Sequence, residues 1–138
     1  MQFEANNVKR LIYVAGSFSP APGSPSAINL KIRRQIFGTL WGLQGMLNDN
    51  DKVIDFLSRS KIDFIVARPS VLQEYVKTKE GEKKVVQVVA AAPKFNEPIS
   101  YADNAKWVVD ALTCAELKNR FPLLGYGDGS TLVSQAGL

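Results

Sequence analysis

The stretch VKRLIYVAG, residues 8–16, decides the fold of this chain. It starts with charged residues and becomes a continuous run of apolar, mostly β-branched and aromatic residues. Such runs are typical of a strand that is buried on both faces of a parallel sheet. The stretch therefore predicts a strand from Val8 to Ala15, which ends at Gly16 and Ser17.

A second strand of the same kind is predicted at DFIVAR, residues 63–68, and Pro69 follows it. The segment FSPAPGSPS, residues 18–26, predicts a loop because its three prolines and its glycine disfavour helix and strand. The intervening residues 27–60 have helical spacing. A strand, a helical crossover and a second strand indicate a βαβ unit with parallel strands.

The crossover is expected to hold two helices. The first covers residues 27–47, and its apolar face is formed by Ile28, Ile32, Ile36, Leu40 and Leu43. A polar turn, NDND at residues 48–51, separates it from a second helix that runs from Lys52 to Ser60.

The rest of the chain predicts three more strands and one helix. Two strand-like runs, Val71 to Lys77 and Lys84 to Ala91, could form a hairpin around Gly81. The last strand is expected at residues 122–127. The order of elements is β-α-α-β-β-β-α-β, which predicts an α/β fold with a largely parallel sheet at its start.

The helix expected at residues 100–113 has clear start signals. Ser100 is its N-cap candidate, and Asp103 is placed to reach back in the manner of a capping box. Its apolar face is expected to be lined by Ala102, Ala105, Val109 and Leu112, with Trp107 and Val108 widening it.

Composition narrows the classes of function. The chain has 138 residues, which suits one domain, here residues 1–127 followed by a flexible tail at 128–138. The net charge of +4 is spread over short clusters, so no nucleic-acid partner is expected. The chain has one cysteine, Cys114, and no histidine, which excludes Ser-His-Asp and Cys-His catalysis and disfavours a metal site.

The location expected from the sequence is the cytoplasm. The polar amino terminus shows no signal peptide, and no apolar run reaches the roughly 20 residues that a transmembrane helix needs. No membrane partner is expected on these grounds.

Four segments, taken together, carry a resemblance to a known family. They are NNVKRLIYVAGS, VIDFLSRSKIDFIVARPS, PISYADNAKWVVDAL and LLGYG, and they span roughly residues 6–127. In this order they resemble the later part of the NAD(P)-binding Rossmann domain of atypical short-chain dehydrogenases/reductases. The branch they are most similar to is the NmrA-like and biliverdin/flavin reductase-like one.

The resemblance covers only the C-terminal half of that domain. The family begins with a strand and a G-x-x-G-x-x-G loop, which brings backbone N–H groups to the cofactor pyrophosphate. This chain has no such βαβ unit, and GYGDG at residues 125–129 has the wrong spacing and reads as a turn. We therefore expect a truncated Rossmann-like sheet that is incomplete for NAD(P) binding on its own.

The family's Tyr-x-x-x-Lys pair is absent as well. Its tyrosine acts as a general acid and its lysine lowers the pKa of that tyrosine. The matching positions fall near Met46 and Asn50, so no proton donor is assigned. Tyr13 and Tyr101 are expected to be packing residues, and Asp103 a helix cap.

The resemblance places the nicotinamide end of the cofactor over the carboxyl ends of the first two predicted strands, as in open α/β sheets generally. The residues there are Ala15, Gly16, Ser17, Pro69, Ser70 and Val71. The hydroxyl of Ser17 could bond substrate or ribose, and backbone groups of Ser70 and Val71 could meet the carboxamide. In each case an ordinary strand end is the alternative. Arg68 could pair with a carboxylate or take part in catalysis.

Three functions stay open at this point. The chain could be an inactive remnant, an NAD(P)H-dependent reductase completed by a partner chain, or a non-catalytic NmrA-like regulatory module. In each case the strand at residues 8–15 would present an unpaired edge. We therefore expect a homodimer, or pairing with a complementing N-terminal half, through this edge.

Overall fold

The computed structural model describes residues 8–22, 28–74, 84–88 and 98–127. The chain divides into two compact units. The first is formed by the residues up to Ser17 and from Ile62 onward, and the second by Phe18–Lys61.

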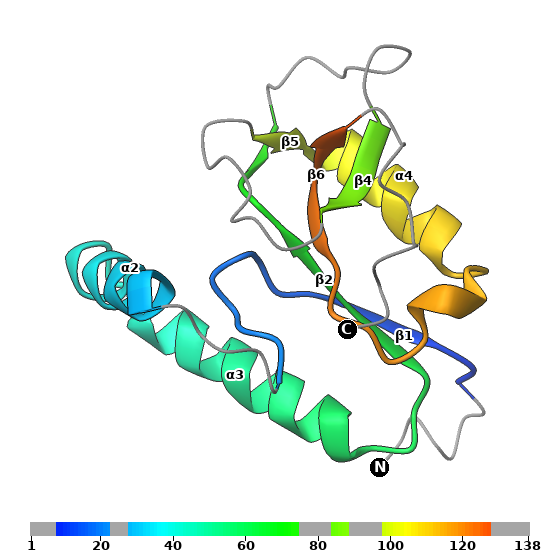
Figure 1. The fold of residues 1–138 in the computed structure, drawn as a ribbon, viewed down its shortest axis with the longest axis horizontal. Coiled ribbons are helices and arrows are strands. Elements are labelled where there is room, and N and C mark those ends of the chain that lie inside the picture. The colour runs from blue at the N-terminus through cyan, green and yellow to red at the C-terminus, as the bar shows by residue number, and fades with distance from the viewer. Residues whose placement is uncertain (1–7, 23–27, 75–83, 89–97, 128–138) are drawn as a thin grey trace. The chain divides into compact units, whose positions relative to one another are not determined.

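The first unit is built on a four-stranded sheet. Its strands, in spatial order, are β1 (Leu11–Val14), β2 (Phe64–Pro69), β6 (Leu123–Gly127) and β4 (Lys84–Val88). β1, β2 and β6 are parallel, and β4 runs antiparallel to β6 (Figure 1). A small parallel pair, β3 (Leu72–Gln73) with β5 (Ile99–Ser100), completes the described strands.

This arrangement confirms the expected α/β class, with a partial Rossmann-like parallel sheet. Leu11 lies opposite Phe64 and Val14 opposite Ala67, so the two predicted apolar runs are direct neighbours. The centre of β2 is wholly buried, as its unbroken apolar composition requires. The tail at residues 128–138, expected to be flexible, lies outside the described residues.

The hairpin expected around Gly81 lies outside the described residues, and the described parts of the two strand-like runs pair with other strands. β3 pairs with β5, and β4 pairs with β6 over a register from Lys84–Gly127 to Val88–Leu123. β4 thus pairs with the edge of β6 that faces away from β2. Residues 75–83 and 89–97, where the two runs continue, lie outside the described residues.

Helix α4 (Tyr101–Ala111) packs against the sheet and is followed by a short 3₁₀ turn, η1 (Ala115–Leu117). Its predicted N-cap is confirmed, because the Ser100 hydroxyl accepts a hydrogen bond from the Asp103 N–H at 3.0 Å. Most of its predicted apolar face is wrong, because Ala102, Ala105, Val109 and Leu112 are exposed. Trp107, which was expected only to widen that face, packs with Ala111 against Ile65. The face that holds Trp107 buries more apolar surface than the alanine-rich face does.

The second unit is a pair of helices, α2 (Ile28–Leu40) and α3 (Gln44–Arg59). The expected break at residues 48–51 is wrong, because α3 runs straight through them. The break falls at residues 41–43, where Gly42 adopts a positive φ of 65°. Glycine reaches this left-handed conformation without strain and commonly ends a helix in this way.

The two helices are joined by one guanidinium. Arg34 forms a bidentate pair with Asp51 at 3.2 and 2.6 Å and donates a third bond to the Phe18 carbonyl at 2.8 Å. The ring of Phe37 packs on those of Phe18 and Trp41, with centroids 5.1 and 5.4 Å away. The Arg34 contacts use the side of α2 opposite to its predicted apolar face. Ile32, Ile36 and Leu40 are consequently exposed, and not in the core as expected.

A second guanidinium joins the amino ends of β1 and β2 to the carboxyl end of α4. Arg10 donates through Nε and Nη2 to both Asp63 oxygens, at 3.1 and 2.9 Å. Its Nη1 reaches the carbonyls of Ala111, Leu112 and Cys114 at 3.1, 3.1 and 2.7 Å. The Arg10 and Asp63 side chains are only 13% and 20% exposed. One side chain thus bonds three carbonyls at the helix end, two of which, those of Ala111 and Cys114, also accept a backbone N–H.

Replacing Arg10 should therefore destabilise the first unit strongly. We expect Arg10→Met to lower the free energy of unfolding by about 2–3 kcal/mol, because it leaves a largely buried carboxylate unpaired and removes the bonds to the end of α4. The matched control is Arg59→Met, since the Arg59–Asp55 side chains are 78% and 58% exposed. The control should change stability by less than about 0.5 kcal/mol. Equal losses in urea unfolding would contradict the role given to Arg10.

Candidate functional site

The carboxyl ends of β1 and β2 lie side by side, as the sequence predicted. Backbone bonds continue past the end of β1, from the Ala15 N–H to the Ala67 carbonyl and from the Ser17 N–H to the Pro69 carbonyl, both at 2.9 Å. The structure therefore brings Ala15–Ser17 next to Pro69–Ser70. This is the edge at which open α/β sheets bind their ligands.

The serine hydroxyl at this edge has a weak partner within the protein. Ser17 Oγ donates to the Ser70 carbonyl at 3.4 Å, and both residues are buried. This distance is long for an O–H···O hydrogen bond, which usually measures about 2.7–2.8 Å. If this hydroxyl bonded a stronger acceptor instead, the protein would lose little stability. The protein thus holds this hydroxyl by a weak bond only.

Gly16 shapes the backbone between β1 and Ser17. Its φ is +104°, and a Cβ added there would meet no heavy atom within 4 Å. The positive φ requires glycine, and the open space leaves the backbone approachable by another molecule. The carbonyl of Val71, by contrast, is already in use, because it accepts the Ile99 N–H at 2.7 Å. That carbonyl joins the end of β2 to β5.

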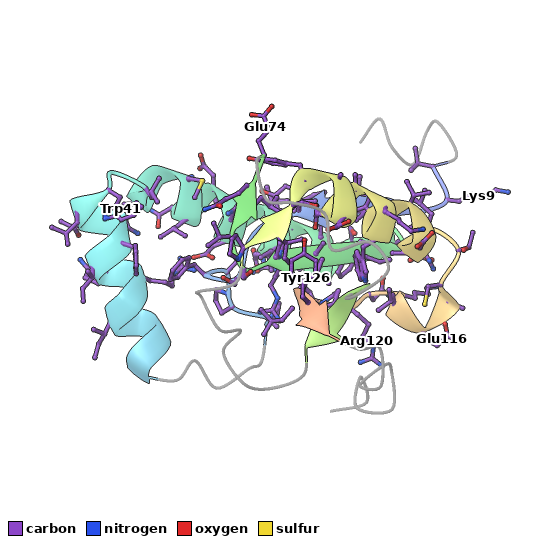
Figure 2. The ribbon with its side chains drawn as sticks, turned by 90° about the horizontal axis from the view of Figure 1, so that it is seen from above. Lys9, Trp41, Glu74, Glu116, Arg120 and Tyr126 are labelled. Carbon is purple, nitrogen blue, oxygen red and sulfur yellow. The ribbon has the colours of Figure 1, made fainter. Side chains whose placement is uncertain are left out.

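A tyrosine that the sequence reasoning did not consider lies near the same edge. Tyr126 is near the carboxyl end of β6, which runs parallel to β2. The side chain is labelled in Figure 2. Its hydroxyl donates to Asp103 Oδ2 at 2.6 Å and accepts the Ser100 N–H at 3.1 Å. The signal that could have found it is its place at the end of the predicted last strand. Tyr101, which was considered, is 54% exposed on α4.

Tyr126 also completes the expected capping box in an altered form. The carboxylate of Asp103 does not bond the Ser100 N–H directly, and the Tyr126 hydroxyl connects the two groups. The reason is length, because the capping box normally uses glutamate or glutamine at this position and aspartate is one methylene shorter. The phenol fills the gap. It thereby links β6 to the start of α4.

Arg68 has a structural role at the end of β2. Its Nε and Nη2 donate to the Phe121 carbonyl at 2.9 and 2.5 Å, which attaches β2 to the segment that leads into β6. Burial lowers the pKa of the Arg68 guanidinium to about 10, so it is still a cation at neutral pH.

Other candidate chemistry is not supported among the described residues. They contain no group of three or more potential metal ligands, and no helix long and apolar enough to cross a membrane. The Cys114 thiol donates to Glu116 at 3.1 Å, and desolvation is the main cause that raises its pKa. In the GYGDG segment, Gly125 and Gly127 belong to β6 and not to a turn, and Gly129 lies outside the described residues.

The positions that match the family's Tyr-x-x-x-Lys pair lie one turn apart in α3. Met46 is exposed, and Asn50 is buried on the same helix. Neither side chain can act as a general acid. The structure thus adds no proton donor at these positions.

No family model matches the sequence, and no curated protein matches it. Solved structures do match. They include a protein assigned as an NAD-dependent epimerase/dehydratase from Bacillus halodurans, with 19% identity, a TM-score of 0.63, and coverage of 92% of this chain and 50% of that one. The anaerobillin reductase ChuY from Escherichia coli is 16% identical, with a TM-score of 0.61 and coverage of 91% and 53%.

The oxidoreductase YlbE from Lactococcus lactis is a third such structure, with 17% identity, a TM-score of 0.59 and coverage of 91% and 49%. The chain spans about half the length of each of these proteins. At such identities the likeness establishes the fold, which is that of part of these Rossmann-like proteins.

The Tyr126 bridge predicts a pH dependence. Burial and the bond to Asp103 raise the pKa of Tyr126 above its ordinary value of 10.0. The folded state thus favours the neutral phenol, so this stabilisation is complete below pH 10 and is lost as pH rises through the folded pKa. Stability curves of the wild type and Tyr126→Phe should therefore converge above pH 10. A gap between the two curves that stays constant up to the most alkaline pH would contradict this account.

Proposed function

We propose that this chain is the C-terminal part of an NAD(P)-binding Rossmann domain of the atypical short-chain dehydrogenase type, related to the NmrA-like and biliverdin/flavin reductase-like branch. The single observation that carries the proposal is the backbone ladder that sets Gly16 and Ser17 beside Pro69 and Ser70. Two of the similar structures are named as an NAD-dependent epimerase/dehydratase and a reductase. These names support the nicotinamide-cofactor class.

The residues at this edge suit the nicotinamide end of such a cofactor. Ser17 offers a hydroxyl whose present bond is weak, and Gly16 offers backbone with open space beside it. Backbone groups of Ser70 and Val71 follow directly on the end of β2. The cofactor itself would supply the hydride chemistry, and these residues would bind and orient the ring.

The pyrophosphate end would need contacts that this sequence does not contain. Pyrophosphate binding in Rossmann domains uses a glycine-rich loop that opens a helix. The 138 residues hold no G-x-x-G-x-x-G stretch. We therefore propose that the chain forms a half-site, which binds dinucleotides weakly unless another polypeptide segment supplies the remaining contacts.

The free edge of β1 is the proposed place for that segment. Leu11, Ala15 and Ser17 direct their N–H groups to β2 or its continuation. Because alternate residues of a strand point their backbone groups to opposite edges, Ile12 and Val14 direct theirs away from β2. Among the described strands, β1 pairs with β2 alone. A second copy of the chain, or a complementing N-terminal half, would add its strand at this edge.

A non-catalytic binding module is the second candidate. The observation that favours it is that two of the described hydroxyls near the edge donate to protein acceptors, Ser17 to Ser70 and Tyr126 to Asp103. Neither hydroxyl is therefore oriented to act as a general acid toward a substrate. Oxidation of NADPH by a quinone, flavin or aldehyde in the presence of the protein would exclude this candidate.

The half-site can be tested with halves of the cofactor. Millimolar nicotinamide mononucleotide should shift the backbone amide NMR signals of Gly16, Ser17 and Ser70, whereas AMP should leave them in place. Ser17→Ala should weaken the binding of nicotinamide mononucleotide about fivefold, since one hydrogen bond is worth about 1 kcal/mol. The substitution loses only a 3.4 Å contact in the folded protein. Equal shifts with both nucleotides, or none with either, would overturn the proposed site.

The free edge can be tested with proline. Val14→Pro removes an N–H that points away from β2, so the existing ladder is kept while strand addition is blocked. We expect light scattering to show association for the wild type and a monomer for this variant. Tyr13→Pro is the control, because it removes an N–H that faces β2 and should destabilise the fold itself. A wild-type chain that is monomeric at all concentrations would count against the homodimer and leave only the complementing half.

A further inference from the structure

An apolar surface runs along the outer face of α2. Four large side chains form it and are 52%, 47%, 74% and 68% exposed, namely Ile32, Ile36, Leu40 and Trp41. We call these residues the α2 stripe. The first three recur every four residues and share one helix face, and Trp41 follows directly at the end of the helix (Figure 2). Clustered exposure of this kind marks a binding surface more often than scattered apolar residues do.

The helix cannot readily roll over to bury the stripe. Its other face is attached to α3 by the Arg34–Asp51 pair, and Arg34 also bonds the Phe18 carbonyl. Gly38 lies so close to α3 that a Cβ there would meet the Gln44 side-chain oxygen. Rotation of α2 would break these contacts. The stripe is therefore exposed within this unit as a fixed feature of the helix pair.

The charge of the helix indicates what kind of partner would cover it. α2 contains three cationic residues, Lys31, Arg33 and Arg34, and no acidic residue. Arg34 pairs with Asp51. The sequence places the two other cations of the helix directly before and after Ile32. Packing α2 against the same helix of a second copy would bring like charges together, which is unfavourable. Charge complementarity thus favours an anionic partner.

A comparison within the chain supports this choice. The outer face of α4 also exposes large apolar residues, among them Val109 and Leu112. There, however, Lys106 pairs with Asp110 at 3.6 Å, so the charges of that face are balanced. Of the helices α2 and α4, only α2 combines an exposed apolar face with net positive charge.

We propose that the α2 stripe docks on an anionic lipid surface. A helix with aliphatic and tryptophan side chains on one face and lysine or arginine beside them lies in the plane of a membrane interface. Trp41 suits the boundary between headgroups and acyl chains. The helix lies on the surface and does not cross the bilayer. The expectation of no membrane partner rested on the absence of a spanning segment, which this mode of binding does not need. The proposal is independent of cofactor binding.

Flotation with lipid vesicles tests the proposal directly. The whole chain should float with vesicles of phosphatidylcholine that contain roughly a third phosphatidylserine, and not with phosphatidylcholine alone. Tryptophan emission should shift to the blue on binding, and Trp41→Phe should abolish most of that shift. High salt should release the protein, because it screens the attraction between the cations and the lipid headgroups.

Two matched variants show whether the stripe is responsible. Leu40→Asp places a charge on the stripe and should weaken vesicle binding at least tenfold. Val109→Asp makes the same kind of change on the outer face of α4 and should leave binding unchanged. Both positions are exposed, at 74% and 63%, so both variants should fold, which circular dichroism can verify.

Three results would overturn the proposal. They are the absence of binding to anionic vesicles, unchanged binding by Leu40→Asp, and self-association of the chain that Leu40→Asp abolishes without any vesicle binding. The last result would assign the stripe to a second copy of the chain.

Discussion

The geometry of the first unit depends on how one guanidinium satisfies a helix end. Arg10 holds the carboxylate of Asp63 and three carbonyls at the end of α4, and so sets the amino ends of β1 and β2 against that helix. Near the other end of the unit, the Tyr126 hydroxyl joins β6 to the first turn of α4. Because α4 is attached at both ends, the strands between these points cannot slide along it. The alignment of Ser17 with Pro69 continues the register of β1 on β2, which starts next to the Arg10–Asp63 pair.

Much of this unit could be predicted from the sequence, because its signals are local and strong. The unbroken apolar runs at VKRLIYVAG and DFIVAR predict strands buried on both faces. β2 is buried in this way, whereas β1 is only partly buried and Val14 is exposed. Their order around a helical segment requires a parallel pairing, which places Gly16 and Ser70 at the same edge. Ser100 was identifiable as an N-cap from its residue type and from Asp103 three positions later.

The features that could not be predicted depend on competition between alternatives of similar strength. Gly42 and the NDND segment are both plausible helix breaks, and the difference is decided by Asp51, whose pairing with Arg34 requires a continuous α3. α4 carries apolar residues on two faces, so periodicity alone could not show that Trp107 faces the sheet. The pairing of β4 with β6, and the meeting of Tyr126 with Asp103, join residues that are distant in the chain.

The bridged helix cap couples two positions that are 23 residues apart in the chain. A glutamate in place of Asp103 would reach the Ser100 N–H by itself and would leave no room for the phenol between them. A phenylalanine in place of Tyr126 would remove the hydroxyl that the shorter aspartate needs. Each single substitution therefore gives a less stable protein, whereas the two substitutions together restore an ordinary capping box. Sequence drift at the end of β6 and at the start of α4 is thus expected to proceed in pairs.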